Sequence, residues 1–128
     1  MPTREAAATE GAIDWQMAII DTHHHFWGHG HFGAEKFGTF LPDDLVAAIH
    51  DSGHTMAATV YMDCGWAFRD SGPEHLRCVG ETEYVESVAR NYSDASQPVG
   101  KIGAGIVGRA NLMLGDAVAE VLDRKSLV

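Results

Sequence analysis

The stretch IIDTHHHFWGHGHFG, residues 19–33, places five histidines directly behind a short apolar run. That run, residues 17–21, predicts a short and fully buried β-strand, since a brief apolar segment followed by polar and glycine-rich residues is typical of strands in parallel sheets. Successive side chains of a strand point to opposite faces, so His23 and His25 should share one face and His24 the other. This stretch therefore decides both the expected fold and the expected site.

Two histidines separated by one residue can form half of a metal site. Imidazoles at positions i and i+2 of a strand lie about 7 Å apart at Cα and can converge on one ion with bonds near 2.1 Å. His23 and His25, at the end of a buried strand, are the candidate metal ligands. The spacing alone leaves an alternative, in which both rings are hydrogen-bonded to the backbone. His24 is expected to pack against the helical layer.

A second pair, His29 and His31, lies among Gly28, Gly30 and Gly33, where no strand fixes the direction of a side chain. These two are predicted to be loop residues near a pocket rather than primary metal ligands. The other histidines are expected on a helix, at a turn and in a loop, in structural roles: His50, His54 and His75.

The rest of the chain alternates strands and helices. Apolar periodicity, β-branched content and the placement of proline and glycine predict helices over residues 41–53, 81–92 and 114–125. They also predict strands over residues 55–63 and 101–110, with a long loop over residues 64–79 between the first two helices. Together with the first strand, this order predicts an α/β fold with a parallel sheet and helices outside it. Residues 1–13 are expected to be a loose lead-in, and residues 14–128 the domain.

Composition narrows the classes of function. The 128 residues carry a formal net charge of −9 with scattered Lys and Arg, which argues against a nucleic-acid partner. No apolar run approaches the roughly 18 residues that cross a bilayer, and residues 1–11 lack the apolar core of a secretory signal. Cys64 and Cys78 form no CxxC pair and are predicted to be free thiols. We therefore expect a cytoplasmic protein with a small-molecule substrate, and homo-oligomer formation stays open.

The segment GAGIVG, residues 103–108, matches the GxGxxG pattern of dinucleotide-binding folds. The required context is missing, because Pro98 and Gly100 interrupt the preceding strand and Gly115 interrupts the helix that should follow. The glycines are better explained as small residues in a tightly packed strand.

Three βα units cannot close a parallel barrel, since a (β/α)₈ barrel takes about 250 residues. We therefore expect the N-terminal three units of a TIM barrel, an incomplete barrel whose long loops would line an active site. Asp63 ends the second strand at that same edge. The alternative is a complete small α/β protein with long loops.

With IIDTHHHFW in place, the chain resembles the amidohydrolase superfamily, and within it the amidohydrolase-related, lactonase-like, metal-dependent TIM-barrel hydrolases. The resemblance runs from about residue 12 to residue 122 and includes LPDDLVAAI, GHTMAATVYMDCGW, GPEHLRCVGETEYV and AGIVGRANLMLGDAV. Asp-Thr-His-x-His at the end of the first strand is the metal signature of the family. The resemblance thus implies that His23 and His25 bind a divalent metal, most often zinc.

The resemblance also implies a reaction. Such an ion lowers the pKa of a bound water to about 7, and the resulting hydroxide attacks a lactone, amide or related carbonyl. Some relatives instead decarboxylate aromatic acids with the same ligands, so a decarboxylase stays open, as does a non-catalytic His-rich metal-binding module or an inactive remnant. The residues expected near the substrate are Trp27, His29, Asp63, Trp66 and Arg109, with Phe68 in the same loops.

The sequence departs from the family pattern at several positions. The third strand ends in GRAN, with Arg109 and Asn111, where the family often has GHAD, and Asp63 stands where Glu is common. The family's later metal-binding histidines and its final catalytic Asp have no counterpart here, and the tail RKSLV differs. No general base is identified, so an intact enzyme of this kind is expected to be a hydrolase, while this chain alone is expected to be inactive.

Overall fold

The structure is a computed structural model that describes residues 11–92 and 99–128. Its elements, in chain order, are β1 (Ala18–His24), α1 (Phe32–Phe37), α2 (Pro42–Ser52), β2 (Thr55–Met62), the short 3₁₀ helix η1 (Glu74–Leu76), α3 (Val79–Asn91), β3 (Lys101–Val107), the 3₁₀ segment η2 (Leu112–Ala117) and α4 (Val118–Ser126). The strands form one parallel sheet in the order β1-β2-β3. The predicted α/β class and parallel sheet are confirmed.

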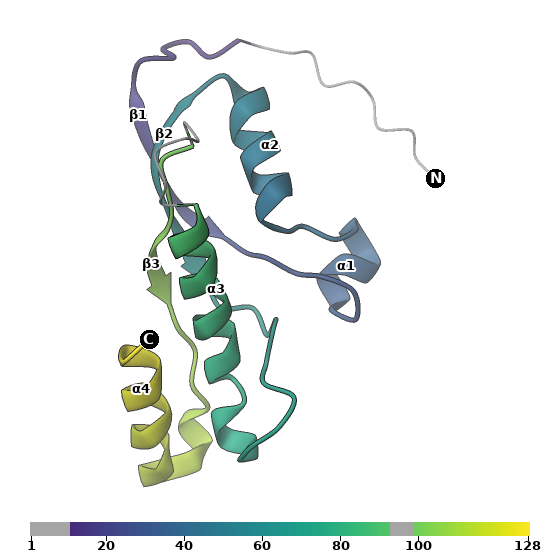
Figure 1. Cartoon of the computed structure of the whole chain (residues 1–128), viewed down its shortest axis with the longest axis vertical. Coiled ribbons are helices and arrows are strands. Elements are labelled where there is room, and N and C mark those ends of the chain that lie inside the picture. Colours follow the sequence, from purple (N-terminus) through teal and green to yellow (C-terminus); the bar gives the residue numbers. More distant parts are fainter. Residues whose placement is uncertain (1–10, 93–98) are drawn as a thin grey trace.

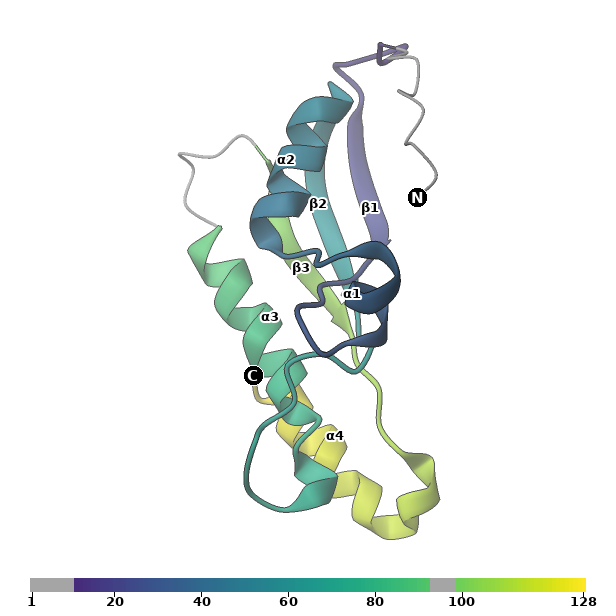
Figure 2. The same cartoon turned by 90° about the vertical axis from the view of Figure 1, so that its right-hand side faces the viewer.

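Helices α2 and α3 cover one face of the sheet (Figure 1), and the view turned by 90° shows both in front of the strands (Figure 2). The core lies between these layers and consists of Phe26, Leu45, Ile49, Tyr61, Val85, Val88, Val99 and Ile102. Helix α4 lies beyond the carboxyl ends of the strands, at the lower end of Figure 1. The carboxyl edge of the sheet therefore faces the loops and α4.

The other face of the sheet is largely open to solvent. Ile20 on β1 is 58% exposed and Val107 on β3 is 49% exposed. The prediction of a fully buried first strand is therefore wrong, and Met17, just before it, is 60% exposed. The reason is that, among the described residues, α2 and α3 cover only one face of the sheet, so the residues of β1 are exposed or half-buried and only His24 is buried.

Helix α2 shows why the sequence signals for helix ends work here. Pro42 occupies the first helical position, where its missing N–H costs nothing, and the Asp44 Oδ2 accepts the Leu41 backbone N–H at 2.8 Å. At the other end Gly53 adopts a left-handed conformation, with φ of +69°, that suits a residue without a Cβ. The expected helix over residues 41–53 is found at Pro42–Ser52.

The structure differs from the prediction at the loops. Helix α1 falls within the segment expected to be a loop, because six residues are too few for an apolar period to show. The last helix begins at Val118 rather than at residue 114, since Gly115, inside η2, has φ of +58° and ψ of −135°, which an α-helix does not accommodate. Residues 1–10 of the expected lead-in and the predicted break over residues 93–98 lie outside the described residues.

Both cysteines, Cys64 and Cys78, are free thiols, as expected. Across residues 11–92 and 99–128, no helix combines the length and the apolar character needed to cross a bilayer.

Candidate functional site

His23 and His25 come together at the carboxyl end of β1. Their Nε2 atoms are 3.2 Å apart, and the two rings meet edge to face with centroids 4.9 Å apart. His23 is exposed and His25 is half-buried. The two Nε2 atoms therefore converge on one point that solvent can reach.

The ring of His25 is held in place from two sides. Its Nδ1 lies 2.8 Å from the Met62 carbonyl oxygen at the end of β2, and Trp27 stacks on the ring with centroids 5.9 Å apart. A carbonyl only accepts hydrogen bonds, so Nδ1 carries the proton and Nε2 of the neutral ring keeps its lone pair. Metal-binding histidines are commonly oriented by such a bond from the second ring nitrogen to a backbone carbonyl.

The geometry of His23 and His25 fits a divalent metal. Two nitrogens bound to zinc at about 2.1 Å with a tetrahedral angle lie about 3.4 Å apart, close to the 3.2 Å between these Nε2 atoms. Without an ion, the same separation suits one shared proton in an N–H···N hydrogen bond. Within the described ranges, no cluster of three or more His, Cys, Asp or Glu residues could hold an ion. The described residues thus bring two imidazole nitrogens together without a third ligand beside them.

His24 points the other way and belongs to the core. It is 7% exposed, its Nε2 lies 2.9 Å from the Thr59 Oγ1, and its ring packs against Phe26 and Tyr61. The Thr59 Oγ1 also accepts the backbone N–H of Gly103 at 2.9 Å, so this hydroxyl links β1, β2 and β3 in the core. Burial lowers the pKa of His24, which keeps the ring neutral at neutral pH.

His31 is engaged at both ring nitrogens. Its Nδ1 accepts the backbone N–H of Gly33 at 3.1 Å, which makes it the N-cap of α1, and its Nε2 lies 3.0 Å from the Cys64 carbonyl oxygen. Because Nε2 must donate to that carbonyl, neither nitrogen has a free lone pair for a metal. His29 is exposed, and Trp27 stacks on His31 while its indole N–H donates to the Gly38 carbonyl oxygen at 2.9 Å.

Asp63 is buried at the carboxyl end of β2 and joins β2, β3 and α4. Its side chain is 2% exposed, and its Oδ2 accepts the Lys125 Nζ at 2.6 Å and the backbone N–H of Arg109 at 2.7 Å. The Oδ1 is also buried and has no hydrogen-bond partner among the described residues. The structure does not bring Asp63 into a ligand cluster with His23 and His25.

Glu81, on α3, organises the loop after β2, a role that the sequence did not predict. It is 1% exposed, its Oε1 accepts the Tyr61 hydroxyl and the Cys64 backbone N–H at 2.8 Å each, and its Oε2 accepts the Gly65 N–H at 3.0 Å. Burial and the Glu81 carboxylate raise the pKa of Tyr61. Burial raises the pKa of the Cys64 thiol to about 11, so Cys64 is protonated and unsuited to act as a nucleophile.

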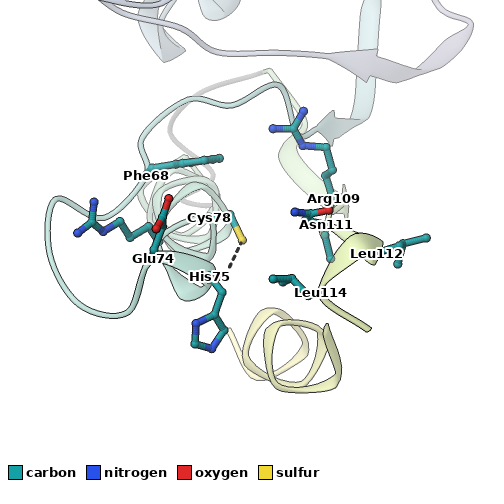
Figure 3. Close-up of a pocket in the computed structure, with 10 residues that line it drawn as sticks. Phe68, Glu74, His75, Cys78, Arg109, Asn111, Leu112 and Leu114 are labelled. Carbon is teal, nitrogen blue, oxygen red and sulfur yellow. Dashed lines mark hydrogen bonds between the residues drawn. The ribbon is translucent and has the colours of Figure 1, made fainter. Parts of the chain in front are cut away.

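Trp66 and Arg109 follow β2 and β3 respectively. Trp66 packs against the core and against Tyr84, and its ring passes so close to Gly28 that a Cβ there would lie 2.5 Å from the Trp66 Cη2. Only glycine fits at position 28. Arg109 is exposed and lines an open cavity, together with Phe68 (Figure 3).

Comparisons with models of protein families, with curated proteins and with solved structures found no match to this chain.

Proposed function

We propose that this chain supplies, through His23 and His25, half of the ligand set of a divalent metal centre in a hydrolase. The observation that carries the proposal is the 3.2 Å separation of the two Nε2 atoms, combined with the bond from the His25 Nδ1 to the Met62 carbonyl oxygen. A zinc ion that displaced the proton between the two Nε2 atoms would be within reach of both nitrogens.

The position of the pair in the fold supports a catalytic centre. Ligands of parallel α/β sheets bind at the carboxyl ends of the strands, and His23 lies in the last residues of β1 while His25 directly follows that strand. Both lie opposite His24, on the face that α2 and α3 leave open, because the register of β1 against β2 shifts between Asp21 and His24. In a (β/α)₈ barrel this face would be the inside, so we propose that β1, β2 and β3 are consecutive strands of such a barrel.

The expected chemistry is attack of water on a lactone, an amide or a related carbonyl. A bound zinc ion would supply it by lowering the pKa of a coordinated water to about 7. In this arrangement His25 is the more rigid ligand, since Met62 and Trp27 fix its ring, and His23 completes the pair from the solvent side. Since a catalytic zinc has three protein ligands, we expect the chain alone to bind metal without hydrolysing a lactone.

The test is a calorimetric titration of zinc into the purified chain. Replacing both ligands, His23→Ala with His25→Ala, should lower the affinity at least about a hundredfold, since two coordinate bonds are lost. A matched double variant, His29→Ala with His54→Ala, removes two exposed histidines elsewhere and should bind zinc as the wild type does. Comparable losses in the two double variants would contradict the proposal and favour a diffuse His-rich binding loop.

A further inference from the structure

An open cavity of about 1030 Å³ lies between the loop that leads from β2 into η1 and the segment that leads from β3 into η2 (Figure 3). We propose that this cavity binds a small organic carboxylate with an aromatic or aliphatic body. The proposal goes beyond the metal half-site and does not depend on it.

The wall formed by the chain after β3 presents hydrogen-bond donors. The Asn111 Oδ1 accepts the backbone N–H of Met113 at 3.0 Å as the N-cap of η2, which leaves the amide NH₂ group unused by that bond. Figure 3 shows the Asn111 nitrogen turned into the cavity and the Arg109 guanidinium above it. Both groups can donate to a ligand, and the guanidinium cannot accept.

Arg109 is well placed to meet an anion. Its backbone N–H is fixed by the buried Asp63 Oδ2 at 2.7 Å, and Lys125 holds that same oxygen, so the start of the side chain is anchored. Within the described part of the chain, no hydrogen bond or ion pair engages its guanidinium. Arg77 also lines the cavity and donates from its Nε to the Gly72 carbonyl oxygen at 3.3 Å, so two guanidinium groups border this cavity in a protein with a formal net charge of −9. The planar guanidinium matches the two oxygens of a carboxylate.

The opposite wall combines the Phe68 ring and the Cys78 thiol with the polar side chains of Glu74, His75 and Arg77, and its apolar part suits the body of the ligand. The Phe68 ring reaches into the gap from the loop after β2 and the Cys78 thiol from the start of α3, while the Leu114 side chain points into it from η2, on the wall of Asn111 (Figure 3). Phe68 is 41% exposed, so a ligand ring could still cover much of it. Glu74 also lines the cavity, and its negative charge should weaken the binding of an anion.

The experiment titrates phenylacetate into the metal-free full chain, kept with a chelator, and follows binding by calorimetry and by backbone amide shifts. Phenylacetamide has the same ring without the charge and is the matched probe. We expect millimolar binding of phenylacetate, with amide shifts around Arg109 and Asn111, and at least about tenfold weaker binding of phenylacetamide, the ratio that about 1.4 kcal/mol produces. Equal binding of the two probes, or no binding of phenylacetate by the folded chain, would overturn the proposal.

Variants then locate the site. Arg109→Gln removes the charge and should weaken phenylacetate binding at least about tenfold. Asn111→Asp keeps the oxygen that caps η2 but replaces the donor amide by a carboxylate oxygen, and should weaken binding to a similar degree. Glu74→Gln should tighten binding severalfold. The control Arg124→Gln, on the exposed surface of α4, should bind as the wild type does.

Circular dichroism and a thermal melt confirm that each variant is folded before its affinity is compared. Wild-type affinity in folded Arg109→Gln, or an equal loss in Arg124→Gln, would overturn the proposal. Because the chelator removes metal throughout, failure here leaves the zinc titration of His23 and His25 untouched, and failure of that titration leaves this result untouched.

Discussion

His24 and its two neighbours are chemically identical side chains on opposite faces of the sheet. His24 is 7% exposed, bonded to Thr59 and surrounded by aromatic rings, while His23 is exposed and His25 is half-buried, with their Nε2 atoms turned toward each other. On the covered face, the Nε2 of His24 makes a hydrogen bond with Thr59 in the core. The open face has kept two such nitrogens available for a ligand.

This difference teaches where function can reside in such a sheet. A buried polar group must find a protein partner or destabilise the fold, so the core retains few free donors or acceptors. Glu81 illustrates the rule on the covered side, with three donors around one carboxylate. A nitrogen that is to bind a metal must therefore lie where water can reach it before the ion arrives, and His23 is exposed in this way.

The largest difference in stability is expected between replacing the buried His24 and replacing the exposed His23 by alanine. His24→Ala removes a buried ring and leaves Thr59 without its partner, and should lower the free energy of unfolding by about 3 kcal/mol. His23→Ala, one residue earlier on the exposed side, should change it by less than about 0.5 kcal/mol. Urea unfolding followed by circular dichroism measures both. Equal losses would show that the two faces do not differ as described.

A second, smaller difference in unfolding free energy is expected between variants of two glutamates on α3. Glu81→Gln puts an amide NH₂ group against N–H or O–H donors and should cost about 2 kcal/mol of unfolding free energy. Glu83→Gln removes only an exposed pair with Arg69, worth less than about 1 kcal/mol. The same urea experiment compares them. If Glu83→Gln proved the more damaging, the loop after β2 would not depend on the buried carboxylate.

The order of strands and helices was predictable because each depends on neighbouring residues. The apolar run before the histidines, Pro42 at the start of α2 and Gly53 at its end each act within a few positions. Alternation along a strand is equally local, which is why it separates His24 from His23 and His25. These features need no knowledge of the tertiary structure.

The long-range contacts were not predictable in this way. Glu81 reads in the sequence as an ordinary acidic residue at a helix start, and nothing there indicates that Tyr61, Cys64 and Gly65 surround it. The buried pair of Asp63 with Lys125 joins residues 62 positions apart. The prediction that the whole of β1 is buried was also wrong, because the composition of a strand does not reveal whether helices cover one face of the sheet or both.

The central claim is that His23 and His25 together hold one ion, and nitrogen NMR of the imidazole rings tests it most directly. With histidine labelled by ¹⁵N, long-range proton–nitrogen spectra before and after one equivalent of zinc report the state of each ring nitrogen among the eight histidines. We predict that the Nε2 signals of His23 and His25 move together to the range of metal-bound imidazole, while those of His24 stay unchanged. Movement at His29 or His31 with an unchanged His25 would contradict the account.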